Sequence, residues 1–109
     1  EAFQQAFNAH QRRFTDGRQL LGPDAASMAG AAFTALGADV TVSSSPWHLG
    51  PDERALTAAW LEGWVGAAVE QEPALGTNSA AYVRARMEQV EAGELTVRVD
   101  HHDLLVLPR

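Results

Sequence analysis

The chain of 109 residues, with 46% hydrophobic and 20% charged residues, has the size and composition of one small globular domain. Its 8 basic and 14 acidic side chains give a net charge of −6, so nucleic acid is not an expected partner, because no basic stripe can neutralise phosphates. The lack of cysteine excludes disulfides and thiolate metal sites, and without a long apolar run we expect no membrane partner and a cytoplasmic location.

The first predicted element is a helix over residues 1–14. Phe3, Phe7 and Phe14 recur at helical spacing and share one face, and Asp16-Gly17 is expected to end the helix. The chain starts at Glu1 inside this pattern and without an initiator methionine. We therefore expect that it begins within a longer protein.

Two further helices begin with the same four letters, LGPD, at residues 21–24 and 49–52. Proline at the first helical position gives up a donor that would have no partner, and the aspartate complements the positive end of the helix. The first copy predicts a helix that ends before Gly37, and the second predicts a long helix over residues 51–72, which Pro73 closes. The residues that follow the two copies differ, so no structural repeat is inferred.

The strands are predicted from a change of period. Residues 39–45 alternate apolar and polar side chains, and Pro46 should end this strand. After a loop at residues 73–79 and a fourth helix that ends near Gly93, the tail ELTVRVDHHDLLVLPR forms either one long bent strand or two short strands. The predicted order is ααβααβ, a helix-rich α/β fold.

This strand set is too small to be stable alone, because two strands without further cover are marginal in water. The continuous apolar run Leu104 to Leu107 predicts burial on both faces, which is the condition of a strand inside a larger sheet. The sequence therefore predicts that sheet neighbours belong to this pair.

The sequence holds no motif for catalysis or for metal and phosphate binding. His101 and His102 are adjacent and would point to opposite faces of a strand, so no metal site is expected. Ser43 to Ser45 lie near His48, but the glycine elbow GxSxG that exposes a catalytic serine is missing. Glycine loops of the types GxGxxG and GxxxxGK[ST] are missing too.

Two groups of side chains are candidates for ligand binding. Asn8, His10 and Gln11 end the first helix, where a polar group is usually a solvated face. Trp47 and its neighbour His48 follow the carboxyl end of the first strand, the edge at which open α/β sheets bind ligands.

The long helix is apolar on almost every side, with Trp60 and Trp64 four residues apart. A helix of this kind must be covered on several faces. It is therefore either a buried core element or a lid over an apolar ligand pocket.

A family resemblance adds to this interpretation. The segments FNAHQRR, LLGPDAASMAGAAFTALGADVTVSSSPWHLGPDERALTAAWLEGW and VRVDHHDLLVLPR resemble the C-terminal half of a bacterial class I S-adenosylmethionine-dependent methyltransferase. The resemblance implies a doubly wound, Rossmann-like sheet in which the last strand is antiparallel and lies between the fifth and sixth. Residues 39–45 would be the sixth strand, the tail the seventh, and residues 51–92 a helical insertion between them.

The resemblance also implies which parts of such an enzyme this single domain, residues 1–109, would lack. The glycine-rich loop and the acidic residue that hold S-adenosylmethionine in the family precede the matched region, so the cofactor belongs to the parent protein and none is expected to bind this chain. The run RFTDGRQL departs from the family pattern after FN-x-HQ. No catalytic residue can be assigned, and the chain alone is expected to be inactive.

Within that resemblance, a small-molecule substrate is the expected ligand of the parent protein, and Asn8, His10, Gln11, Trp47 and His48 are the candidate substrate-binding residues. The alternative is a non-catalytic α+β interaction or dimerisation module. In either case the exposed strand edge predicts a homodimer, because unpaired edges recruit further strands.

Overall fold

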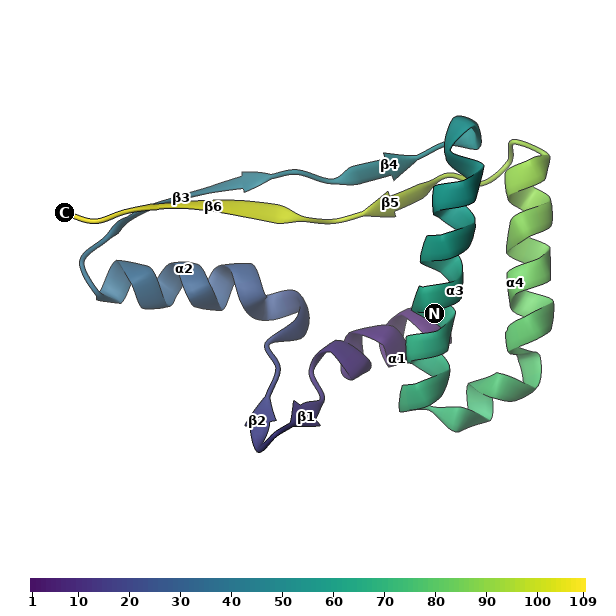
Figure 1. The fold of residues 1–109 in the computed structure, drawn as a ribbon, viewed down its shortest axis with the longest axis horizontal. Coiled ribbons are helices and arrows are strands. Elements are labelled where there is room, and N and C mark those ends of the chain that lie inside the picture. Colours follow the sequence, from purple (N-terminus) through teal and green to yellow (C-terminus); the bar gives the residue numbers. More distant parts are fainter.

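A computed structural model describes all of residues 1–109 (Figure 1). The four α-helices are α1 (Ala2–Gln11), α2 (Ala25–Ala35), α3 (Arg54–Gln71) and α4 (Gly76–Glu91). Short 3-10 helices precede three of them: η1 (Gly22–Asp24), η2 (Pro51–Glu53) and η3 (Pro73–Leu75). The strands are β1 (Phe14–Thr15), β2 (Arg18–Gln19), β3 (Asp39–Ser44), β4 (Trp47–Leu49), β5 (Val97–Val99) and β6 (His102–Leu107).

A long antiparallel ribbon of two strands runs along one side of the molecule (Figure 1). It consists of the β3–β6 pair, in which Val40 lies opposite Val106, and the β4–β5 pair, in which Trp47 lies opposite Val99. The Ser45 amide donates to the His101 carbonyl at 2.8 Å between the two pairs. The ladder is interrupted at the following proline, which has no N–H to donate.

Helix α2 packs against one face of the β3–β6 pair. A β-carbon placed on Gly30 would lie 3.8 Å from both Val40 and Leu104, so helix and strands are in close contact at this point. The opposite face of the pair is open, with Leu105 57% and Leu107 52% exposed. Leu104 to Leu107 are therefore not buried on both faces within this chain, and the larger sheet that would cover them stays a prediction.

Helices α1, α3 and α4 form a separate helical unit at the other end of the ribbon (Figure 1). The core between them is apolar and consists of Phe3, Ala6, Leu61, Val65 and Ala68. Leu49 of β4 and Val90 of α4 are buried as well. This unit therefore holds the main hydrophobic core of the protein.

Helix α1 is shorter than predicted. It ends at Gln11, and Phe14 enters a small hairpin, β1–β2, instead of continuing the helix. Asp16 and Gly17 form its turn with φ values of 50° and 74°, the left-handed conformation typical of Asp-Gly turns. Phe14 is 73% exposed there, so it does not share the buried face of Phe3 as its spacing suggested.

The molecule is extended rather than spherical. Its radius of gyration is 17.0 Å, whereas a compact domain of about this length has roughly 13 Å. Only 9 of the 109 residues are buried. No helix combines the length and the apolar character that crossing a membrane requires.

The predicted order of the principal elements is confirmed. Both LGPD copies begin helices through a 3-10 turn with proline at its start, and the tail forms two strands rather than one. The predicted loop at residues 73–79 is wrong, since η3 and the first turn of α4 occupy it. The fold is helix-rich α/β with antiparallel strand pairs, and each sheet has 2 strands. A doubly wound sheet is not formed within this chain.

Candidate ligand pocket

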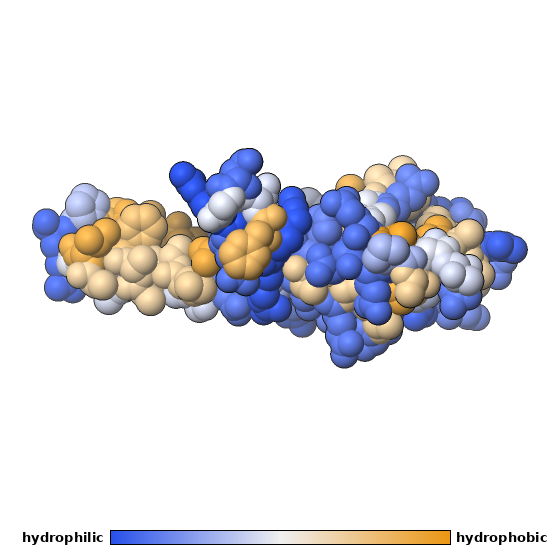
Figure 2. Space-filling view, turned by 90° about the horizontal axis from the view of Figure 1, so that it is seen from below, coloured by the Kyte–Doolittle hydropathy of each residue, from blue (hydrophilic) through white to orange (hydrophobic).

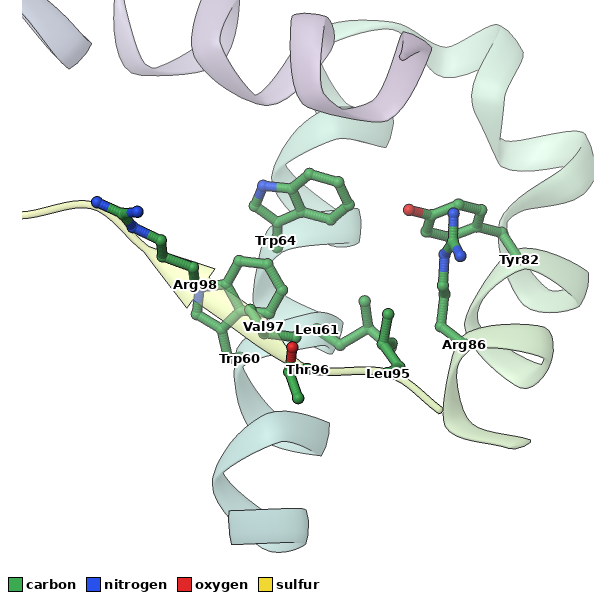
Figure 3. A pocket seen from close by; sticks show the side chains of 9 residues that line it. All are labelled: Trp60, Leu61, Trp64, Tyr82, Arg86, Leu95, Thr96, Val97 and Arg98. Carbon is green, nitrogen blue, oxygen red and sulfur yellow. The ribbon is translucent and has the colours of Figure 1, made fainter. Parts of the chain in front are cut away.

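A pocket of about 280 Å³ lies between α3, α4 and the segment that leads into β5 (Figure 3). Six of its nine lining residues are hydrophobic, and none is acidic. The lining consists of Trp60, Leu61, Trp64, Tyr82, Arg86, Leu95, Thr96, Val97 and Arg98. Three successive segments of the chain therefore meet at one apolar cavity.

The aromatic wall of the pocket is built by helical spacing. Trp60 and Trp64 lie four residues apart on α3, and their rings stack with centroids 5.3 Å apart. Tyr82 of α4 faces Trp64 at 6.3 Å, and its hydroxyl points toward that indole in Figure 3. Tyr82 also stacks on Phe3 of the core, with ring centroids 4.2 Å apart. The wall is thus continuous with the hydrophobic core, which holds these rings in place.

Arg86 places a positive charge at the pocket. Its guanidinium carbon lies 5.0 Å from the centre of the Tyr82 ring, an attractive cation–π arrangement, and Figure 3 shows the two groups side by side. One of its terminal nitrogens donates to Gln89 Oε1 at 2.9 Å. Because this partner is neutral, no carboxylate compensates the charge of Arg86.

Arg98, at the far end of the lining, differs from Arg86. Its Nε donates to Asp100 Oδ1 at 2.8 Å, so its charge is paired at the rim. The remaining polar groups of the lining are the hydroxyls of Thr96 and Tyr82. No histidine, cysteine or carboxylate lines the pocket, and no group of three or more metal-ligating side chains occurs in the structure. The arrangement is suited to binding a ligand rather than to forming or breaking bonds by its own groups.

A second hollow of about 530 Å³ lies on another face of the α3–α4 pair. It is lined by Val65, Val69 and Val83 together with small residues, and Glu62 and Arg84 contribute opposite charges. It is a wide and open groove without aromatic rings. It offers a ligand no aromatic face on which a ring could stack.

The predicted residues of α1 lie outside both hollows. Asn8 and Gln11 are half-buried, and His10 lies against α3 with its Nε2 at 3.4 Å from Glu70 Oε1. That approach does not have hydrogen-bond geometry, so Nε2 is buried without a hydrogen-bond partner. His10 Nδ1 lies 3.2 Å from an Arg13 nitrogen, which can only donate. Nδ1 is therefore placed to accept from Arg13, while Nε2 faces Glu70.

The predicted residues of β4 lie on the ribbon, also outside the pocket. Trp47 is 49% exposed and its ring lies 4.9 Å from that of His101. His48 points to the other face, opposite Arg98 in the strand register. No hydrogen bond, ion pair or ring contact joins these two residues to Asn8, His10 or Gln11. Their role in substrate binding stays a prediction.

The pocket contains residues that the sequence pattern indicated and others that it did not. The sequence left open whether the long helix with Trp60 and Trp64 is a core element or a lid over a pocket. In the structure both rings pack against the hydrophobic core, and both also line the pocket. Arg86 and Arg98 were not predicted. The sequence signal for Arg86 is its position four residues after Tyr82, because residues at this spacing lie on the same face of a helix and bring the cation beside the ring.

No family model, no curated protein and no solved structure matches the chain. The geometry of the pocket and of the ribbon is therefore the basis for assigning a function.

Proposed function

We propose that this chain is the C-terminal, substrate-side part of a class I S-adenosylmethionine-dependent methyltransferase that acts on a small molecule. The observation that carries the proposal is the β3–β6 pair, which is antiparallel, is covered by α2 on one face, and has no strand on either outer edge. In the family that the sequence resembles, the last strand is antiparallel to the sixth and lies between it and the fifth. β3 would be that sixth strand, and the free edge of β6 would accept the fifth.

The position of the helical pair also supports the proposal. Helices α3 and α4 leave the ribbon after β4 and return to it before β5, as expected of an insertion over residues 51–92 between the last two strands. The pocket lies where this insertion meets the ribbon at Leu95 to Arg98. An insertion at that place is suited to covering a substrate.

The pocket itself does not suit S-adenosylmethionine. The methionine part of the cofactor carries a sulfonium, an ammonium and a carboxylate group. An arginine suits only the carboxylate, and the lining has two arginines but no acidic residue for the two cationic groups. The cofactor would be held by other strands of the parent sheet. This chain would then contact the methyl acceptor rather than the cofactor.

In such an enzyme the contribution of this chain is to position the substrate and to exclude water. Methyl transfer is a direct in-line displacement, whose rate depends on holding the two reactants in line and at short distance. The rings of Trp60, Trp64 and Tyr82 provide a rigid apolar surface on which an acceptor can be oriented.

The test is reconstitution with the polypeptide encoded directly upstream. Titration calorimetry of the chain alone with S-adenosylmethionine should show no binding at micromolar concentration, whereas a mixture with the upstream polypeptide should bind the cofactor. Hydrogen exchange should become slower in the mixture at those β6 amides that do not donate to β3. Micromolar binding by the chain alone, or a mixture that leaves β6 exchange unchanged, would contradict the proposal.

The second candidate is a non-catalytic interaction module, and one observation favours it. Helix α2 exposes a row of apolar side chains, including Met28, Phe33 and Leu36, and Leu36 is 82% exposed. Figure 2 shows this apolar patch at the end of the molecule that holds α2. The upstream reading frame distinguishes the two functions. A strand followed by a glycine-rich loop within about 150 residues favours the enzyme, and its absence favours the module.

A further inference from the structure

We propose that the aromatic pocket binds a small planar aromatic carboxylate, with its ring against Trp60 and Trp64 and its carboxylate on Arg86. The binding site does not depend on methyl transfer. That such an acid is the methyl acceptor rests on the proposed function.

The size and the wall of the pocket indicate a small flat ligand. Its volume of about 280 Å³ is at the lower end of ligand pockets, which span roughly 300–1,000 Å³. The stacked indoles of Trp60 and Trp64, at 5.3 Å, present extended apolar faces of the kind that favour offset contact with another ring. Figure 3 shows these two rings and the side chain of Val97 around the same space.

The charge of the pocket decides the sign of the ligand. Four of the chain's arginines are paired with carboxylates: Arg12 with Asp24, Arg54 with Glu91, Arg98 with Asp100 and Arg109 with Asp39. Among the arginines without such a pair, Arg13, Arg18 and Arg84 are exposed, whereas Arg86 is half-buried and lines the pocket. The protein has a net charge of −6, yet no carboxylate pairs with this half-buried cation. Arg86 is therefore available to an anionic ligand.

The guanidinium of Arg86 has donors left for a carboxylate. An arginine carries five N–H groups in a planar fork, and Gln89 accepts from one terminal nitrogen only. Arginine binds carboxylates through paired hydrogen bonds, which are about twice as strong as those between neutral groups. The ring of Tyr82, 5.0 Å from the guanidinium carbon, and the hydrogen bond to Gln89 restrict this side chain, so less side-chain entropy is lost when a carboxylate binds.

A cationic ligand is the main alternative, because aromatic rings also form cages for quaternary ammonium groups. Cages of that kind are not built around an uncompensated arginine, since two like charges in one apolar cavity repel each other. The lining has no carboxylate to offset Arg86. The pocket therefore favours an anion.

Titration calorimetry of the chain with three probes of one shape tests the proposal: naphthoate, naphthamide and naphthylmethylammonium. Naphthoate should bind about tenfold or more tightly than naphthamide, because its carboxylate can form a paired, oppositely charged contact with the guanidinium of Arg86, whereas the amide is neutral. Naphthylmethylammonium should bind more weakly than either. Equal affinity for the acid and the amide, or preference for the ammonium probe, would overturn the proposal.

Substitutions identify the residues. Arg86→Gln should weaken naphthoate binding about tenfold or more and leave naphthamide within about twofold. The matched control is Arg84→Gln, an exposed arginine on the same helix, which should change neither affinity. Equal losses in the two variants would contradict the role of Arg86. Should Arg86→Gln unfold, as circular dichroism would show, the ratio of acid to amide on the unsubstituted chain decides the matter.

Trp60→Leu tests the ring contact separately. It should weaken both naphthoate and naphthamide, because it removes stacking area and not charge. Unchanged affinities would place the ligand elsewhere. None of these titrations needs the cofactor or a second polypeptide. If naphthoate does not bind, the methyltransferase proposal is unaffected. If the reconstitution fails, the proposal of an aromatic carboxylate site is unaffected.

Discussion

The two ends of the molecule differ in how much they bury. At one end, α1, α3 and α4 enclose a core around Leu61 and Val65, each 4% exposed. At the other end, α2 and the β3–β6 pair bury only Gly30, while Leu36 and Leu105 face solvent. The second end has an apolar sequence but lacks the layer that would cover it.

This difference teaches that the two ends depend on different partners. Burial of apolar area is the main source of folding free energy. The helical unit obtains it from its own side chains, whereas the ribbon end must obtain much of it from another polypeptide. Matched substitutions at the two ends test this difference.

Leu61→Ala should lower the free energy of unfolding by about 2–5 kcal/mol, because a cavity replaces buried methyl groups in the helical core. The matched substitution at the ribbon end is Leu105→Ala, which should cost no more than about 0.5 kcal/mol, since the side chain is exposed. Urea denaturation followed by circular dichroism measures both. Similar losses would show that the two ends are equally packed.

Self-association should depend on the ribbon end. Light scattering at high concentration is expected to show a homodimer formed through the open strand edge. Leu105→Lys should weaken the dimer about tenfold, because lysine on an edge strand opposes pairing. Leu36→Lys, on α2, is the comparison that separates this edge from the apolar helix face. A monomer at every concentration would contradict the expectation.

Gly30→Ala should stabilise the protein by about 0.5–1 kcal/mol. The position lies inside α2, and the added β-carbon would meet Val40 and Leu104 at 3.8 Å, an ordinary contact distance. Gly22→Ala is the opposite case, because φ is 58° and the β-carbon would lie 2.8 Å from Arg12 Cγ. The midpoint temperature of thermal unfolding should be higher in Gly30→Ala and lower in Gly22→Ala than in the unsubstituted protein. A loss at Gly30 would mean that the contact between α2 and the strands is too tight for a methyl group.

Arg12→Gln should lower the stability only slightly, by about 0.2–1 kcal/mol. Its ion pair with Asp24, at 3.2 Å, joins the two ends of the molecule, but both side chains are largely exposed and the pair is screened by salt. Unfolding at low and high salt measures the effect, which should shrink as salt is added. A loss as large as that of Leu61→Ala would reveal a rigid link between the two ends.

The elements with strong periodicity could be predicted from the sequence. The LGPD starts located two helices, and the alternation from Asp39 onward located β3, because caps and period are local properties. Local patterns were insufficient where tertiary contact decides. Residues 76–79 have loop-like composition, yet they begin α4, and a β-carbon placed on Gly76 would lie 3.4 Å from Val69 of α3.

The short strands and the pocket could not be predicted. β4 has only 3 residues and follows Pro46, so its alternation is too brief to detect, and its pairing with β5 joins positions about fifty residues apart. The pocket depends on which faces of α3 and α4 meet the segment before β5. Tyr82 is half-buried, but the sequence does not show that Arg86, four residues later, lines the same pocket.

The pairing of Leu49 with Val97 has a consequence for how this protein can change over evolution. Because Leu49 and Val97 are paired, residues 50–96 leave the ribbon and return to it at adjacent positions. We call residues 50–96 the cassette, since they form one insertion with neighbouring ends. A different helical pair could be exchanged there without rerouting the strands, provided that α1 found a new surface to lie on. Diversity in ligand choice would then arise by replacing the cassette while the scaffold beneath it is inherited unchanged.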